Sequence, residues 1–227
     1  MLEKRIHIIT GHYGVGKSEI SVNLAVKLSK QGRKVLFADM DIINPYFRSN
    51  EARHILEKHG IEVTATKFAN TNVDIPALTG ELRKYLFDRS YDIVMDVGGD
   101  NAGALVVGRY RNEIRDKEAA LYYVINCFRP ETATVSSVIN VLNEIRDASR
   151  MDVSYLINNS HLMDDTTNSD IEKGIDFAQE VSKTTKIPIV FHAVMKKDGI
   201  KISKDIKEPV FWLNKTMTLE NHLQFLE

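Results

Sequence analysis

The segment "IHIITGHYGVGKSEI", residues 6–20, decides the fold class of this chain. A short apolar run ends in a loop with three glycines, and a helical pattern of apolar residues follows it directly. From Gly11 to Ser18 the loop satisfies the spacing G-x-x-x-x-G-K-[ST] at every fixed position. A phosphate-binding loop requires a strand before it and a helix after it, and both patterns are present. The segment therefore predicts a loop that cradles a nucleotide phosphate.

Each part of this loop has a chemical role in binding phosphate. The glycines let backbone N–H groups turn inward around phosphate oxygens, and the next helix directs its positive N-terminal end toward them. Lys17 is predicted to neutralise the β- and γ-phosphates, and the hydroxyl of Ser18 to ligate Mg²⁺. We expect the nucleotide contacts of this segment to come from Gly11, His12, Tyr13, Gly14, Val15, Gly16, Lys17, Ser18 and Glu19.

Outside this segment, short β-branched runs alternate with longer helical patterns. The expected strands are Arg5–Thr10, Lys34–Met40, Ile61–Thr66, Tyr91–Val97, Ala119–Asn126, Asp152–Asn158 and Ile187–Ala193. The expected helices are Lys17–Lys30, Ser49–His59, Pro76–Asp88, Ala102–Glu113, Glu131–Ser149 and Ser169–Thr185. Continuous apolar strands are typical of a parallel sheet that is covered on both faces. The pattern predicts one doubly wound, mainly parallel α/β domain over residues 1–227, with a short closing helix at Leu219–Leu226.

The composition is that of an ordinary globular protein, with 43% hydrophobic and 27% charged residues. Thirty basic and 31 acidic residues leave a net charge of -1, which provides no general attraction to nucleic acid or to an anionic membrane. No stretch approaches the ~20 apolar residues that span a bilayer. The single cysteine, Cys127, rules out an intrachain disulfide. We expect a cytoplasmic enzyme or switch with no membrane partner, and we do not expect nucleic acid.

Aspartates follow two of the apolar strands. The run "VLFADMD" contains Asp39 and Asp41, and "YDIVMDVGGD" contains Asp96 and Asp100. The carboxyl ends of parallel strands meet at the edge of the sheet where ligands bind. Asp96 has the pattern that holds Mg²⁺ beside a phosphate loop, and the glycine pair after it would let the backbone approach a γ-phosphate. A helix cap or a turn is the alternative role for each aspartate.

Together these residues resemble the MinD/ParA group of P-loop ATPases, which includes nitrogenase iron protein and metallocentre-maturation ATPases. The similarity runs through "GHYGVGKSEISVNLAVKLSKQGRKVLFADMD", residues 11–41. "DVGGD", residues 96–100, resembles the switch segment of the iron protein. "CFRPET", residues 127–132, resembles the Pro-Glu that opens a helix after the fifth strand of the family. The resemblance covers about residues 5–160.

The resemblance implies a Mg²⁺-dependent ATPase. Lys17 and Asp41 would be its catalytic residues, with Asp41 polarising the attacking water. Ser18, Asp39 and Asp96 would organise Mg²⁺. The segments 41–50 and 96–103 would be two switches that sense the difference between ATP and ADP.

Recognition of the base is expected at the end of a later strand. Asn158 stands where relatives contact adenine; the alternative is a strand-end asparagine that bonds its own turn. No Asn-Lys-x-Asp or Thr-Lys-x-Asp guanine motif occurs in the chain. ATP is therefore expected in preference to GTP.

The chain departs from the family pattern at His12. Relatives carry a second lysine there, which reaches across a dimer to the nucleotide of the partner. An ATP-dependent homodimer, which the resemblance implies, would need another cation, because histidine is mostly neutral at pH 7. Arg48, Arg109 or Arg111 could supply that charge, with a solvated surface position as the alternative for each.

Two classes of function are favoured by the sequence. A third, partitioning through nonspecific DNA binding, predicts a basic surface and is weakened because the lysines near the tail are interspersed with Asp205 and Glu208. The first is an ATP-hydrolysing switch whose ATP and ADP states present different surfaces to a partner protein. The second is a small-molecule kinase or a dethiobiotin-synthetase-like ligase, in which Arg48, Arg83 and Lys84 could bind an acidic substrate. Asp-x-Asp at the second strand favours hydrolysis, although the same carboxylate could activate an acceptor hydroxyl.

Overall fold

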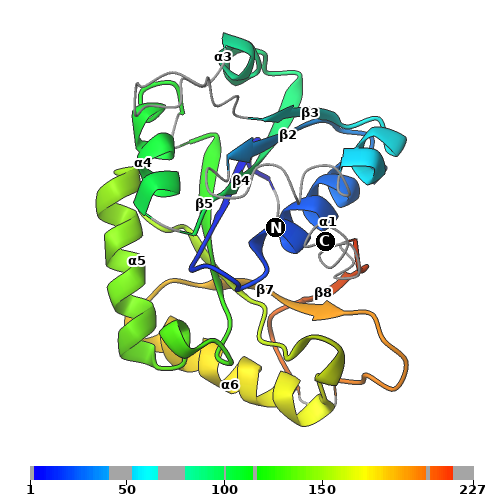
Figure 1. Ribbon diagram of the computed structural model, residues 1–227, viewed down its shortest axis with the longest axis vertical. Helices are drawn as coiled ribbons and strands as arrows, with labels where there is room; N and C mark the ends of the chain where they lie inside the picture. The colour runs from blue at the N-terminus through cyan, green and yellow to red at the C-terminus, as the bar shows by residue number, and fades with distance from the viewer. Residues whose placement is uncertain are drawn as a thin grey trace, which may run out of the picture.

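The structure of the protein is a computed structural model, which describes residues 3–40, 53–65, 80–99, 101–114, 117–202 and 205–216. Eight strands form one sheet in the order β3-β2-β4-β1-β5-β6-β7-β8, and every neighbouring pair is parallel (Figure 1). The strands are β1 (Ile6–Thr10), β2 (Lys34–Met40), β3 (Glu62–Ala65), β4 (Tyr91–Val97), β5 (Ala119–Ile125), β6 (Tyr155–Asn158), β7 (Ile189–Met195) and β8 (Val210–Leu213). The predicted parallel α/β fold is confirmed.

Helices follow the strands and cover both faces of the sheet. They are α1 (Lys17–Lys30), α3 (Gly80–Phe87), α4 (Asn101–Arg109), α5 (Val135–Ser149) and α6 (Asn168–Thr185), and residues 53–58 are also helical. The predicted helix Lys17–Lys30 is confirmed to the residue. The predicted closing helix, Leu219–Leu226, lies outside the described residues, as do parts of the predicted helices Ser49–His59 and Pro76–Asp88.

Two predicted elements differ from the structure in informative ways. The expected helix Glu131–Ser149 is divided into a short 3₁₀ turn, Pro130–Thr132, and helix α5. Thr134 caps α5, because its hydroxyl accepts from the N–H of Ser137, so a new helix begins there. Strand β8 was not predicted, because its four residues follow a polar stretch and show no long apolar run. Pairing with β7 places it at the edge of the sheet.

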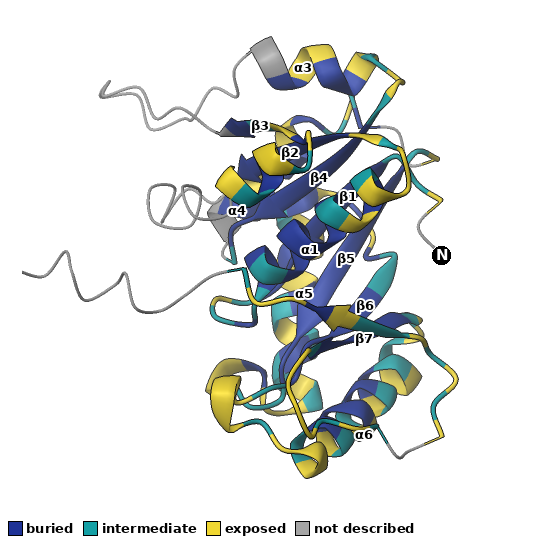
Figure 2. Ribbon diagram, turned by 90° about the vertical axis from the view of Figure 1, so that its right-hand side faces the viewer, coloured by how far each residue is buried: buried dark blue, intermediate teal, exposed yellow. Residues whose placement is uncertain are grey.

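Buried side chains form a hydrophobic layer on each face of the sheet. One layer joins the strands to α3, α4, α5 and α6, and the other joins them to α1 and the helical residues 53–58. Figure 2 shows the central strands almost wholly buried between helices whose outer faces are exposed. All five residues of β1 are buried, which is why the strand lacks the regular alternation of a half-exposed strand. This rigid central strand leads directly into the glycine loop.

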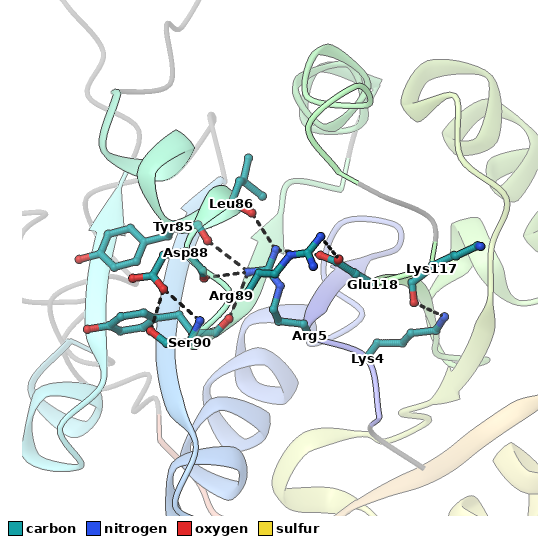
Figure 3. A network of polar contacts seen from close by, with 10 residues as sticks. Lys4, Arg5, Tyr85, Leu86, Asp88, Arg89, Ser90, Lys117 and Glu118 are labelled. Atoms are coloured by element: carbon teal, nitrogen blue, oxygen red, sulfur yellow. Dashed lines mark hydrogen bonds and ion pairs between the residues drawn. The ribbon is translucent and has the colours of Figure 1, made fainter.

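Arg5 fastens the chain just before β1 to the end of α3. Its guanidinium donates to the carbonyls of Tyr85 and Leu86 at 3.2 and 2.8 Å and forms an ion pair with Glu118 at 3.3 Å (Figure 3). The last carbonyls of a helix have no partner within the helix, so a cation placed there satisfies them and complements the helix dipole. These contacts lie at the amino ends of the strands, on the side of the sheet away from the glycine loop.

His7, the second residue of β1, is a buried titratable group. Its side chain is 0% exposed, and its Nδ1 lies 3.1 Å from the hydroxyl of Tyr122. Burial, with a smaller contribution from the charge of Arg33, lowers the pKa of His7 from 6.5 to about 4. Folded His7 therefore stays neutral in a range of pH in which the unfolded chain takes up a proton.

We expect acid to destabilise the fold through this group. The unfolded state binds more protons between pH 6.5 and 4, so the free energy of unfolding should fall as the pH falls through that window. The contribution of His7 amounts to about 3 kcal/mol. Urea unfolding from pH 4 to 8 measures it, and His7→Gln should flatten the curve. His54→Gln, at an exposed position, is the control; equal slopes in the two variants would contradict this prediction.

Candidate functional site

The loop from Gly11 to Ser18 connects the carboxyl end of β1 to the first turn of α1. Gly14 and Gly16 have φ angles of 76° and 88°, a region that favours glycine. Gly16 stands immediately before α1, so the chain turns into the helix without a side-chain cap. The N–H groups of that first turn therefore have no side-chain acceptor from Gly16, which is the arrangement that receives an anion.

Lys17 and Ser18 begin α1 and are 3% and 5% exposed. The ammonium of Lys17 donates to the carbonyl of His12 at 3.0 Å, so its long side chain runs back across the loop. A cation at this position lies within the ring of backbone that the loop forms. The cation predicted from the spacing of the motif therefore lies against the backbone of the loop.

Asp39 and Asp96 lie side by side near the carboxyl ends of β2 and β4. They are partners in the register of the two parallel strands, and they are 6% and 4% exposed. Ser21 of α1 donates to Asp96 at 3.3 Å, so this carboxylate faces the helix that begins with Lys17 and Ser18. Two adjacent buried carboxylates present hard oxygen atoms of the kind that Mg²⁺ prefers. No cluster of three His, Cys, Asp or Glu side chains that could hold a metal occurs in the described part of the chain.

The glycine pair after β4 touches the loop. A Cβ on Gly99 would lie 2.6 Å from the backbone nitrogen of Tyr13 and 2.8 Å from the ammonium of Lys17. Only a glycine fits such a close approach without a shift of the loop. The predicted second switch, residues 96–103, therefore meets the phosphate loop at Gly99.

Two residues to which the sequence motifs give no role also hydrogen-bond to the backbone of the loop. Nε of Arg129 donates to the carbonyl of Gly14 at 2.9 Å, and Nδ2 of Asn159 donates to the carbonyl of Val15 at 2.8 Å. Arg129 follows β5 and Asn159 follows β6, so both come from the carboxyl edge of the sheet. The run "CFRPET" marks Arg129 only by its place after a strand, and nothing in the sequence marks Asn159.

His161 lies beside the same part of the loop. Its Nε2 is 3.5 Å from the position that a Cβ on Gly16 would occupy, and its Nδ1 accepts from the N–H of Met163 at 3.1 Å. Burial and, secondly, the charge of Arg129 lower the pKa of His161 from 6.5 to about 4. The imidazole is thus neutral at pH 7, with its proton on Nε2 toward Gly16.

Two predicted nucleotide contacts have firm partners within the fold. The carboxylate of Glu19 accepts from the N–H and the hydroxyl of Thr216 at 2.6 and 2.8 Å, and this ties the segment after β8 to α1. Asn158 is 3% exposed; its oxygen accepts from the N–H of Ser160 at 3.1 Å, and its Nδ2 lies 3.0 Å from His192. The strand-end turn foreseen as the alternative for Asn158 is therefore present, and its contact with adenine stays a prediction.

Other predicted residues lie away from the loop or outside the described residues. Three of them, Asp41, Asp100 and Arg48, lie outside the described residues. Arg109 ends α4, and Arg111 donates to the carbonyls of Ile114 and Arg150. Helices run antiparallel to the strands, so the ends of α4 and α5 lie at the amino edge of the sheet, opposite the loop. Arg109 and Arg111 therefore do not supply a charge to the loop of their own chain.

A parallel sheet with this loop, paired aspartates and a touching glycine segment defines the class of P-loop nucleotide-binding proteins. The family model for the CobQ/CobB/MinD/ParA nucleotide binding domain matches residues 6–208. The chain belongs to this family, as the resemblance of its motifs predicted. A search of curated protein sequences gives no match.

Solved structures of the signal recognition particle receptor FtsY share the fold. The protein of Thermotoga maritima is 19% identical with a TM-score of 0.59, over 86% of this chain and 63% of that one. The protein of Elizabethkingia anophelis, in complex with GDP, is 14% identical with a TM-score of 0.55, over 86% and 58%. Chloroplast FtsY of Physcomitrella patens is 18% identical with a TM-score of 0.56, over 87% and 60%. The chain thus spans about three fifths of each protein, and the similarity concerns the fold.

No helix among the described residues is long and apolar enough to cross a membrane.

Proposed function

We propose that this chain is a cytoplasmic, Mg²⁺-dependent ATPase that acts as a molecular switch on a partner protein. One observation carries the proposal: Gly99, which follows the Mg²⁺ candidate Asp96 on β4, touches the loop at Tyr13 and Lys17. A γ-phosphate beside Lys17 would meet this segment, and its loss would change the position of the segment. The bound nucleotide can thereby alter the surface that residues 96–103 present.

Three groups of residues carry the chemistry in this proposal. The loop Gly11–Ser18 holds the phosphates, with Lys17 as the cation that neutralises developing charge. Ser18, Asp39 and Asp96 would hold Mg²⁺, which would neutralise negative charge on the phosphates. Asp41, two positions after Asp39, polarises the attacking water. The preference for ATP rests on the lack of a guanine motif in the sequence.

The hydrolysis step can be isolated with Asp41→Ala. We expect the wild type to release phosphate from ATP without any added acceptor, and faster than from GTP. The variant should slow this release by on the order of 10²-fold while it still binds ATP, since a residue that orients water acts in the chemical step. Phosphate release and equilibrium binding of ATP measure the two effects. Asp147→Ala, a surface change on α5, is the control.

The outcomes separate the candidate functions. Sedimentation of Asp41→Ala with no nucleotide, with ADP-Mg²⁺ and with ATP-Mg²⁺ tests the ATP-dependent homodimer, which requires a larger mass with ATP alone. ADP production that appears only with an added small acid would replace the switch by the kinase or ligase alternative. Faster hydrolysis of GTP than of ATP would overturn the assignment of the nucleotide.

A further inference from the structure

Arg129, to which none of the sequence motifs gives a role, hydrogen-bonds to the backbone of the phosphate loop. Arg129 is half-buried in the connection between β5 and the 3₁₀ turn Pro130–Thr132, and its Nε donates to the carbonyl of Gly14 at 2.9 Å. Within the described ranges no carboxylate forms an ion pair with its guanidinium. A charged donor thus binds a backbone carbonyl of the phosphate loop.

The direction of that carbonyl matters because the peptide bond is planar and trans. The C=O of one residue and the N–H of the next lie in this plane and point in opposite directions. When Arg129 holds the carbonyl of Gly14 on its own side, the N–H of Val15 is turned to the other side. Asn159 does the same for the next peptide, since it holds the carbonyl of Val15 and thereby turns the N–H of Gly16. Two successive N–H groups are therefore directed away from the bracing residues.

The charge of Arg129 also reaches the loop. Its positive charge is one of the causes that lower the pKa of His161, whose Nε2 lies close to Gly16. His161 stays neutral, so Arg129 brings a positive charge to Gly14, while the ammonium of Lys17 lies at the carbonyl of His12. No second copy of the chain is required to place this charge.

We propose that Arg129 is a positioning residue for nucleotide binding, which turns the N–H of Val15 toward the phosphates and adds a positive charge beside them from the same chain. This inference rests on the proposed function, since it concerns the same nucleotide site. It goes beyond that function because Arg129, a residue outside the loop, would supply part of the positive charge that His12 does not provide at the nucleotide.

The test compares Arg129→Ala and Arg129→Gln with the wild type in titrations with mant-ADP and mant-ATP in the presence of Mg²⁺. Arg129→Ala should lower the affinity for both nucleotides by about 10- to 30-fold, because it removes the donor and the charge together. Arg129→Gln keeps a donor without the charge, so it should recover part of the affinity for both. Its remaining loss should be larger for mant-ATP, which carries more negative charge.

The control is Arg146→Ala, which removes a surface arginine of α5 that pairs with Asp152 at 2.8 Å. Melting temperatures without nucleotide, expected within about 2 °C of the wild type for Arg129→Gln, separate binding from folding. Affinities of both Arg129 variants within twofold of the control would overturn the inference. Wild-type affinity of Arg129→Gln for both nucleotides would overturn the role of charge. Failure of the wild type to bind either probe would instead overturn the proposed function.

Discussion

Replacement of Lys17 by methionine should lower kcat/KM for ATP hydrolysis by on the order of 10³-fold. The side chain is 3% exposed, and its ammonium lies across the loop at 3.0 Å from the carbonyl of His12. Methionine fills a similar volume but leaves the phosphates without this cation, in a site where burial makes the interaction strong. Phosphate release measures the rate, and a mant-ATP titration measures how much of the loss is in binding.

Lys30→Met is the matched control for this variant. It makes the same chemical change at the exposed last residue of α1, and it should leave both the rate and the affinity unchanged. Hydrolysis by Lys17→Met at the wild-type rate would show that the loop is not the site of phosphate chemistry. The paired design separates the effect of position 17 from a general loss of positive charge.

Addition of a single methyl group at Gly99, in the variant Gly99→Ala, should lower the affinity for mant-ATP by roughly 10- to 100-fold. The new Cβ would lie 2.6 Å from the nitrogen of Tyr13, 2.8 Å from the carbonyl carbon of His12 and 2.8 Å from the ammonium of Lys17. Two of these atoms are backbone, so the loop must move to make room. We expect Gly99→Ala to weaken mant-ATP more than mant-ADP, because the segment after β4 is placed to meet the γ-phosphate.

Gly108→Ala is the control for the loss of stability that a steric clash causes by itself. A Cβ there would lie 2.5 Å from the carbonyl oxygen of Ala148, between α4 and α5, away from the loop. Both variants should be less stable in urea unfolding. Under conditions in which both are folded, only Gly99→Ala should have a changed nucleotide affinity. Equal nucleotide affinity in the two glycine variants would contradict the contact between the second switch and the loop.

Much of the fold was predictable because its signals are local. Lys17–Lys30, Lys34–Met40 and Tyr91–Val97 have the predicted bounds, since each is an uninterrupted apolar or amphipathic run that ends at a glycine or a polar residue. Strand β8 was missed because its place depends on β7 rather than on its own pattern. The break before α5 was missed because the cap at Thr134 interrupts a segment with continuous helical periodicity.

The candidate site was predictable to a similar degree, and for the same reason. Spacing alone placed Lys17 and Ser18 at the start of a helix, and strand endings placed Asp39 and Asp96 at one edge of the sheet. The sequence could not indicate that these two aspartates are register partners, because register depends on the order of strands. Nor could it separate Arg129 from Arg109 and Arg111, since all three follow or end an element in a similar context.

The sequence by itself determined the phosphate loop, the parallel α/β class and the family, because these depend on residue types at short, fixed separations. The tertiary structure decided which distant residues act on that loop. Arg129 and Asn159 reach its carbonyls, and Gly99 reaches its backbone, from positions about 80 to 140 residues along the chain. Crossover connections bring the ends of β4, β5 and β6 to the same edge as β1, and no local pattern records which side chains meet there.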